Sequence, residues 1–308
     1  MEVLKTALPY IISGISVGGQ YALIAIGYTM VYGILRLINF AHGDVFMVAG
    51  LMMVYFATWM PLYLAIPLMI VLTVLLGFLI ERAAYKPLRT APRMSVMISA
   101  IGVSYLIQNL ALYVTGGLNK NYPAIPWISD PVRLFGMETS RVTVITPFLT
   151  IALVIALVLL INHTKIGMAM RAVSVDFETA QLMGIKINNV ISATFIIGTF
   201  LAAIGSILFF TNFPGVVPTA GAMPGLKAFV AAVFGGIGSV PGAVVGAFII
   251  GICESVIKGL DTILMANGAI TEQVGFATFS DAFTFVLLII ILVFKPTGLF
   301  GEKTTDKV

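Results

Sequence analysis

Two ionisable residues, Lys227 and Glu254, lie within segments that are otherwise almost wholly apolar. Ionisable side chains in such segments, if these cross a bilayer, face the bundle interior, pair with each other or mark a path for a polar solute. At about 1.5 Å of rise per residue, both would lie at a similar depth. We therefore expect them to pair, with Lys258 one helical turn from Glu254 as a competing partner. A structural ion pair and contact with the charged ends of a passing solute are the two interpretations.

A second group of polar residues follows the first long apolar segment: Arg36, Asn39, His42 and Asp44. Asn39 or Asp44 could satisfy free amides at the start of the next helix. The group would then serve as an interfacial anchor and helix cap. The alternative is a gate or a translocation path formed by Asn39, His42 and Asp44. Gln108 and Asn109, in a later apolar segment, are expected to form inter-helix hydrogen bonds.

Several kinds of chemistry find no support in the sequence. No stretch matches the phosphate-binding pattern Gly-x-x-x-x-Gly-Lys-Ser/Thr. His42 and His163 have no Glu or Cys at metal-ligand spacing, and Cys253 is the only cysteine, so no metal site is predicted. No Ser/His/Asp arrangement is recognisable. We predict no catalytic residue, no enzyme activity and no cofactor in this chain.

The polar segment 172–187 is different in character from the apolar segments around it. Ser174 or Asp176 can cap a helix, acidic residues follow in its first turn, and Gly184 can end it. This helix, near 174–185, could lie on the membrane or on its own bundle, or it could insert into a groove on a soluble partner. The second interpretation assigns docking to Asp176, Phe177, Glu178, Thr179, Ala180, Met183 and Gly184.

The composition requires lipid as the solvent, because 59% of the 308 residues are hydrophobic and only 10% are charged, against about 25% in soluble domains. Apolar runs of about 20 residues recur without two-residue alternation, which predicts transmembrane helices. We predict an all-α polytopic integral membrane protein with one domain over residues 1–308. The expected spans are 8–35, 45–60, 62–81, 94–115, 142–162, 189–212, 222–238, 242–258 and 278–294. Eight spans is the alternative if the seventh is a half-helix.

The lysine and arginine residues indicate the orientation. They gather after the third span, after the fifth span and in the tail, for example Arg82 and Arg89, Lys165 and Arg171, and Lys295, Lys303 and Lys307. These loops share one side under a nine-span count, and the positive-inside rule assigns that side to the cytoplasm. The C-terminus is then cytoplasmic and the N-terminus outside, in the inner membrane of a prokaryote. Basic residues confined to short loops do not indicate nucleic-acid binding.

Glycine interrupts the apolar pattern at two places. Gly43 follows the first span, and Gly235, Gly236, Gly238 and Gly242 separate the seventh from the eighth. Interruptions in corresponding halves are typical of transporters, whose binding sites form at broken helices. Two further pairs at a spacing of four, Gly14 with Gly18 and Gly242 with Gly246, predict close helix packing, within one bundle or at a subunit interface.

Four stretches resemble one family of transport proteins. Glu178-Thr179-Ala180, with Gly184, resembles the Glu-Ala-Ala-x-x-x-Gly signature of ABC importer permeases, with Thr179 in place of the middle alanine and without the family's downstream Leu-Pro. Three other stretches resemble LivH-type branched-chain amino-acid permeases. They are 21–33 together with 38–43, then 98–102, and 227–243. The similarity extends from about residue 10 to about residue 300.

The resemblance implies a permease subunit of an ATP-driven importer for leucine, isoleucine and valine, working by alternating access. It implies a second homologous permease, two cytoplasmic ATPases that hold ATP and Mg²⁺, and an extracytoplasmic solute-binding protein. The helix near 174–185 would couple the ATPases to the bundle. Importers of urea, short amides or another small amino acid are the alternatives within the family. A stand-alone secondary carrier or channel is the alternative outside it, and the docking segment argues against that class.

Overall fold

The computed structural model describes residues 2–89, 91–134, 137–270 and 272–301; Lys303 and Lys307 lie outside these ranges. The α-helices are α1 (Glu2–Leu35), α2 (His42–Trp59), α3 (Leu62–Ile80), α4 (Arg93–Thr115), α5 (Arg141–His163), α6 (Lys165–Val175), α7 (Phe177–Leu182), α8 (Ile187–Asn212), α9 (Ala222–Gly235), α10 (Val240–Lys258), α11 (Leu260–Ala266) and α12 (Ser280–Phe294). Shorter turns of helix are η1 (Glu81–Tyr85), η2 (Lys86–Leu88) and η3 (Phe276–Phe279). The strands are β1 (Lys120–Asn121), β2 (Pro131–Leu134), β3 (Met137–Ser140) and β4 (Gly215–Val216).

The described residues fold into a helical bundle, in which seven helical stretches are long and apolar enough to cross a membrane. The polytopic helical prediction is confirmed at this level. Each of the nine predicted ranges contains a helix, and α2 and α9 are the two outside the seven. At 14 residues, α9 is too short to cross a hydrocarbon core that needs about 20. It ends at Gly235, three residues before the predicted end, because Gly236 and Gly238 adopt positive φ angles of 107° and 100°.

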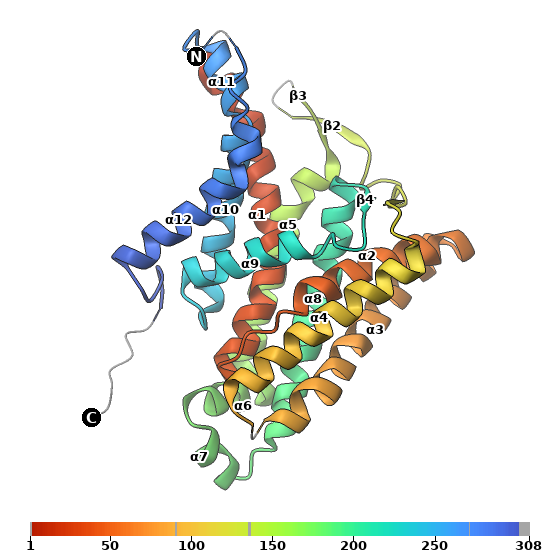
Figure 1. The fold of residues 1–308 in the computed structure, drawn as a ribbon, viewed down its shortest axis with the longest axis vertical. Coiled ribbons are helices and arrows are strands. Elements are labelled where there is room, and N and C mark those ends of the chain that lie inside the picture. Colours follow the sequence, from red (N-terminus) through yellow and green to blue (C-terminus); the bar gives the residue numbers. More distant parts are fainter. Residues whose placement is uncertain (1, 90, 135–136, 271, 302–308) are drawn as a thin grey trace.

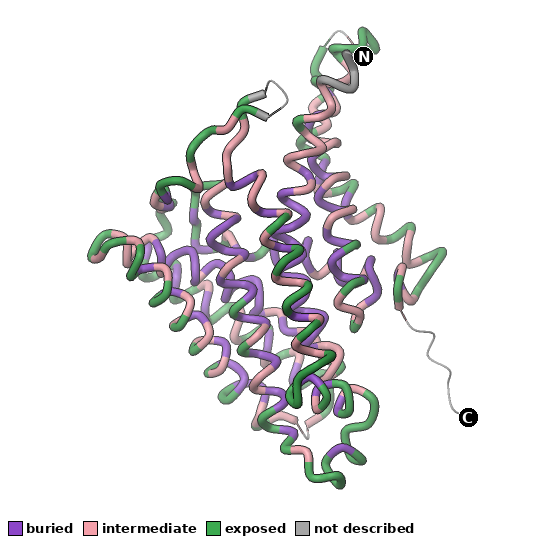
Figure 2. Tube along the Cα trace, turned by 180° about the vertical axis from the view of Figure 1, so that it is seen from behind, coloured by how far each residue is buried: buried purple, intermediate pink, exposed green. Residues whose placement is uncertain are grey.

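Helix α1 forms the centre of the bundle (Figure 1). In its most apolar stretch, 72% of the residues are buried, whereas in the last span, 276–294, only 11% are. Figure 2 shows the buried residues gathered along the middle of the molecule. The faces of α3, α4, α5 and α12 expose many large apolar side chains, among them Leu75, Leu110, Ile155 and Ile289. In water such surfaces would be unfavourable, so they suit contact with lipid or with another membrane subunit.

Small residues allow α1 and α10 to pack backbone to backbone. A Cβ atom at Gly14 would lie 2.7 Å from Cα of Ile252, and one at Gly18 would lie 2.7 Å from Cα of Phe248. From the other side, a Cβ at Gly251 would lie 2.7 Å from the carbonyl oxygen of Gly14. Such close approach increases dispersion contacts and is the usual role of small residues spaced by four in membrane helices. The predicted Gly14–Gly18 spacing therefore serves packing within this chain.

The second predicted pair, Gly242 and Gly246, also packs within the chain. Both glycines lie on α10 against the backbone of α9, at Gly235 and Ala231. Ser239 caps the start of α10 by accepting a hydrogen bond from the amide of Gly242, at 3.2 Å. Helix α9 is therefore held against α10 along much of its length, and α10 is held against α1.

The two ends of the bundle differ in structure. Helices α6 and α7 lie at the lower end in Figure 1, close to the end of α3 and the start of α4. Arg89 hydrogen-bonds to Glu81 and Asn188 there, and Ser192 donates to Glu81 at 2.9 Å. The N-terminus, α11 and the β2–β3 hairpin lie at the opposite end. The basic segments after α3 and α5 thus share one end, as the nine-span count expects.

Short strands tie two connections together at the upper end. β1 pairs with β4 in an antiparallel register, with Lys120 opposite Val216 and Asn121 opposite Gly215. β1 follows α4, and β4 precedes α9. The predicted spans 94–115 and 142–162 leave the residues between them without regular structure, and neither this pairing nor the β2–β3 hairpin was predicted. Helices α6 and α11 were not predicted either. These elements are short, and their apolar periodicity is too brief to read.

We expect Gly251→Leu to lower the yield of monodisperse protein and its melting temperature. The new side chain would press on the α1 backbone, which cannot move aside as a flexible side chain can, and overpacking of this kind costs about 1–3 kcal/mol or more. Thermal unfolding in detergent, followed by size-exclusion chromatography, measures the effect. Gly102→Leu on α4 is the matched control, because no atom lies within 4 Å of a Cβ there. Equal melting temperatures for the two variants would contradict the packing role.

Candidate functional site

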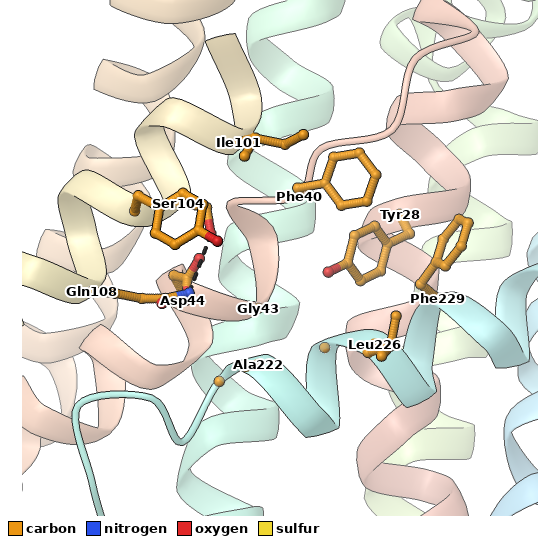
Figure 3. A pocket seen from close by; sticks show the side chains of 13 residues that line it. Tyr28, Phe40, Gly43, Asp44, Ile101, Ser104, Gln108, Ala222, Leu226 and Phe229 are labelled. Atoms are coloured by element: carbon orange, nitrogen blue, oxygen red, sulfur yellow. Dashed lines mark hydrogen bonds between the residues drawn. The ribbon is translucent and has the colours of Figure 1, made fainter. Parts of the chain in front are cut away.

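A cavity of about 370 Å³ lies between α1, α2, α4 and α9, near the middle of α4 (Figure 3). Its walls combine aromatic and aliphatic side chains with three polar ones. The lining residues are Tyr28, Phe40, Gly43, Asp44, Ile101, Ser104, Tyr105, Gln108, Gly221, Ala222, Gly225, Leu226 and Phe229. The volume lies within the range of about 300–1,000 Å³ that is common for small-molecule sites.

The starts of α2 and α9 meet at this cavity through glycine. A Cβ at Gly43 would lie 2.7 Å from the carbonyl oxygen of Gly221, and one at Gly225 would lie 2.9 Å from Cα of Gly43. The Gly43 amide also hydrogen-bonds to the phenol oxygen of Tyr28. Side chains larger than hydrogen would separate the two helix ends. The predicted interruption at Gly43 therefore corresponds to a point of close contact between α2 and α9.

Among the described residues that line the cavity, Asp44 is the one with an acidic or basic side chain of formal charge. It is 2% exposed, and Nε2 of Gln108 donates to its Oδ1 at 3.0 Å. The Ser104 hydroxyl also hydrogen-bonds to it. Asp44 lies in the first turn of α2, where the helix dipole favours negative charge. The expected inter-helix bond of Gln108 is thus present, whereas Asn109 donates to Tyr105 O on its own helix, at 2.7 Å, and that expectation was wrong.

Asn39 and His42, from the same predicted group at the first break, are each 2% exposed, whereas Arg36 is exposed. The Tyr85 hydroxyl donates to Oδ1 of Asn39 at 2.9 Å. The ring of His42 packs edge-on against Tyr28, at 5.1 Å between centroids, and fills the space beside Gly27. Neither Asn39 nor His42 lines the cavity. Of the three proposed path residues near this break, the structure brings only Asp44 to the cavity.

Lys227 and Glu254 form the predicted ion pair, with Nζ and Oε1 2.7 Å apart. Lys258 also contacts Oε1 of Glu254 at 2.5 Å, and the Tyr21 hydroxyl donates to its Oε2 at 3.0 Å. Asp281 of α12 completes the network, 2.6 Å from Nζ of Lys227. We call Lys227, Glu254, Lys258, Asp281 and Tyr21 the ion network. Its two lysines and two carboxylates balance in charge, and none of its members lines the cavity.

Asp281 was missed by the sequence analysis. The signal was present, since an acid stands near the start of the predicted span 278–294. The aromatic and aliphatic cavity residues were not predicted either, because nothing in the sequence distinguishes an apolar side chain that lines a cavity from one that packs elsewhere in the same span. Only the packing of four helices selects them.

The polar segment forms two helices, α6 and α7, in place of the single helix expected near 174–185. Asp176 separates them and caps α7, accepting hydrogen bonds from the amides of Glu178 at 3.0 Å and Thr179 at 3.2 Å. The Thr179 hydroxyl also donates to Asp176, and this bond with those of the two amides holds the pKa of Asp176 below its usual value. Gly184, with φ of 85°, follows the helix as predicted.

The surface of α7 and its neighbours is unusual for an exposed polar segment. Ala180 is buried, whereas Leu182 is 86% exposed and Met183 is 79% exposed. Val175, at the end of α6, is 87% exposed. Phe177 is intermediate between these two cases, since it is 40% exposed and lines a small pocket together with Leu35 and Val96 of the bundle. We call Val175, Phe177, Glu178, Leu182 and Met183 the docking surface.

We expect Asp176→Ala to increase hydrogen exchange at the amides of Glu178 and Thr179, because it removes the cap, while Asp176→Asn should preserve protection. The lowered pKa means that the cap is fully present above the ordinary Asp pKa of about 3.9 and is lost as the pH falls through the folded-state value. Hydrogen exchange with mass spectrometry measures both effects. Equal exchange in the Ala and Asn variants would contradict the capping role.

We expect the ion network to depend most on Glu254. Glu254→Gln leaves two lysines with one remaining carboxylate, whereas Lys227→Met leaves Glu254 paired with Lys258. Breaking a buried pair costs about 3–5 kcal/mol. Melting temperatures in detergent should therefore fall most for Glu254→Gln, less for Lys227→Met and least for Lys258→Met, since the Lys258 side chain is 48% exposed. The reverse order would contradict this account of the network.

Known proteins resemble this chain along almost its whole length. Residues 10–292 match the family described as "Branched-chain amino acid transport system / permease component". The chain is 36% identical to the high-affinity branched-chain amino acid transport system permease protein BraD of Pseudomonas aeruginosa, covering 98% of both chains. It is also 36% identical to the corresponding permease LivH of Escherichia coli K12, over 98% of this chain and 97% of that one. A solved structure of an inward-facing ABC transporter is loosely alike, with a TM-score of 0.46, 15% identity, and coverage of 92% of this chain and 85% of that one. This multi-pass membrane protein belongs to the family of branched-chain amino acid transport system permease components.

Proposed function

We propose that this chain is the membrane permease subunit of an ATP-driven importer of branched-chain amino acids. The observation that carries the proposal is the end-to-end similarity to two permeases that are named for this transport. The family match covers residues 10–292 and so includes the cavity and the docking surface. Hydrolysis of ATP, with Mg²⁺, is assigned to separate subunits, and this chain itself is a translocation component, not an enzyme.

In the proposed topology, nine segments enter the inner membrane, with the N-terminus outside and the C-terminus in the cytoplasm. Helices α2 and α9 each cross part of the bilayer, and the segments 36–41 and 213–221 complete those crossings. The glycine-rich breaks at Gly43 and at Gly235, Gly236, Gly238 and Gly242 mark the ends of these partial helices. Support comes from the basic segments after α3 and α5, which lie at the same end as α6 and α7 (Figure 1).

The docking surface is proposed to bind one of two cytoplasmic ATPases. Its exposed Leu182 and Met183 offer apolar anchors for a groove, and Asp176, Glu178 and Thr179 lie on the exposed side of the same short helix. The attachment of α7 to the bundle suits the transmission of motion from an ATPase to the transmembrane helices. Ala180 is buried, and Gly184 follows the end of the helix. A second, homologous permease and an extracytoplasmic solute-binding protein complete the proposed assembly.

Transport is proposed to proceed by alternating access, with the path beside Asn39, His42 and Asp44. The cavity supports this assignment because it lies near the middle of α4. In the proposed topology this position is at the mid-depth of the bilayer, which a transported solute must cross. Lys227 and Glu254 belong to the proposed path as well, in an alternative pairing during the cycle. Unchanged uptake by Lys227→Met would remove Lys227 from it.

Reconstitution tests the function directly. Proteoliposomes that hold this permease with its partner permease and ATPases should take up labelled leucine only with ATP inside the cytoplasmic compartment and loaded binding protein outside. Labelled urea, added in the same way, should not enter. Uptake that needs an ion gradient and no ATP would identify a secondary carrier and overturn the proposal.

We expect Glu178→Lys to weaken ATPase docking at least about tenfold while leaving insertion and folding intact. The reversed charge lies on the exposed face of α7 and replaces the acid that the helix N-terminus favours. Co-purification of the ATPase with tagged permease measures the effect. The matched control is Glu138→Lys on the exposed β3 strand, whose partner Arg133 is itself 82% exposed. Undiminished ATPase recovery with Glu178→Lys would contradict the assigned docking surface.

A further inference from the structure

Asp44 differs from the other buried carboxylates of the described residues in its partners. Glu254 is held by two lysines, and Glu81 is paired with Arg89. Asp261 accepts hydrogen bonds from three backbone amides, those of Val274, Gly275 and Phe276. Asp44 has only the neutral donors Gln108 and Ser104, and no lysine, arginine or histidine of the described chain forms an ion pair with it. A buried charge without a counter-ion is unfavourable in a medium of low dielectric constant.

The dipole of α2 offsets part of this cost, since it is equivalent to about half a unit charge at the helix start. The part of the Asp44 charge that the dipole does not compensate would be balanced by a cationic ligand. Asp44 is one of the residues that line the cavity of about 370 Å³, where it is 2% exposed. The polar donors Gln108 and Ser104 approach it from α4 (Figure 3).

The rest of the wall suits an ammonium group attached to an apolar body. The rings of Tyr28 and Phe229 lie edge to face, at 6.0 Å between centroids, and Phe40 stands beside them (Figure 3). Aromatic faces attract cations through their quadrupole. Ile101 and Leu226 supply aliphatic surface on opposite sides of the opening. No lysine, arginine or histidine is among the described residues that line the cavity, so none of them would repel an ammonium group.

We propose that this cavity is a transient binding site for the amino acid in transit, with its ammonium group on the Asp44 carboxylate and its aliphatic side chain against Phe40, Ile101, Leu226 and Phe229. The inference rests on the proposed transport function and adds a means of selection within the membrane. A neutral amide such as urea lacks the charge that would compensate Asp44. A fatty acid of the same shape lacks it too, and its carboxylate would face the acid.

Uptake by the reconstituted importer tests the role of Asp44. We expect Asp44→Asn to lower kcat/KM for leucine at least about tenfold, because truncating one partner of a buried charge pair commonly costs more than that factor. Asp130→Asn, an exposed carboxylate in the outer connection, is the matched control and should transport normally. Unchanged uptake by Asp44→Asn would overturn the inference while leaving the transport function standing.

Photolabelling locates the site without depending on that variant. Leucine that carries a diazirine in its side chain, delivered by the binding protein, is illuminated during turnover by the wild-type importer, and peptides are mapped by mass spectrometry. We expect label within α2, α4 or α9 at the cavity, competed by leucine and not by 4-methylpentanoate. Leu226→Trp, which fills the opening, should abolish that label even if Asp44→Asn fails to fold. Label that is confined to the binding protein, or label that is competed by 4-methylpentanoate, would overturn the proposed site. Absence of ATP-dependent uptake by the wild-type importer would instead refute the transport function.

Discussion

A charged side chain inside a bilayer must find its partner within the protein, because lipid offers none. This constraint organises the polar residues of the bundle. The ion network satisfies two lysines and two carboxylates and joins α1, α9, α10 and α12. At the lower end, Arg89 and Glu81 satisfy each other. Asp44 stands apart, since its partners are neutral and its open side is a cavity. The degree of compensation thus distinguishes Asp44 from the other buried charges of the described residues.

Glycine determines where that cavity can exist. The backbone contact between α1 and α10 fixes the centre of the bundle, and α9 is held against α10 in the same manner. Gly43 and Gly221 then let the starts of α2 and α9 touch, which closes the cavity on one side. Larger residues would separate the two helix ends. The small residues of this chain therefore shape the space available to a solute, although they supply none of its chemical character.

Much of the bundle could be predicted from sequence because apolar segments and charged interruptions are local signals. The pairing of Lys227 with Glu254 followed from their similar depth, and the cap at Asp176 and stop at Gly184 followed from residue preferences. The cavity could not be predicted, since Tyr28, Ile101 and Phe229 come from three helices whose lateral packing leaves no trace in periodicity. Asp281 was missed for a related reason. An acid near the start of a span reads equally well as a cap or as a distant residue's partner.

The short β1–β4 pairing has a mechanical consequence. It fastens the connection after α4 to the connection before α9, and these two helices supply opposite walls of the cavity. A displacement of either connection would therefore be passed to the other through main-chain hydrogen bonds. Because only two residue pairs form the β1–β4 pairing, it can transmit a displacement between the two connections while adding little stiffness to the helical bundle.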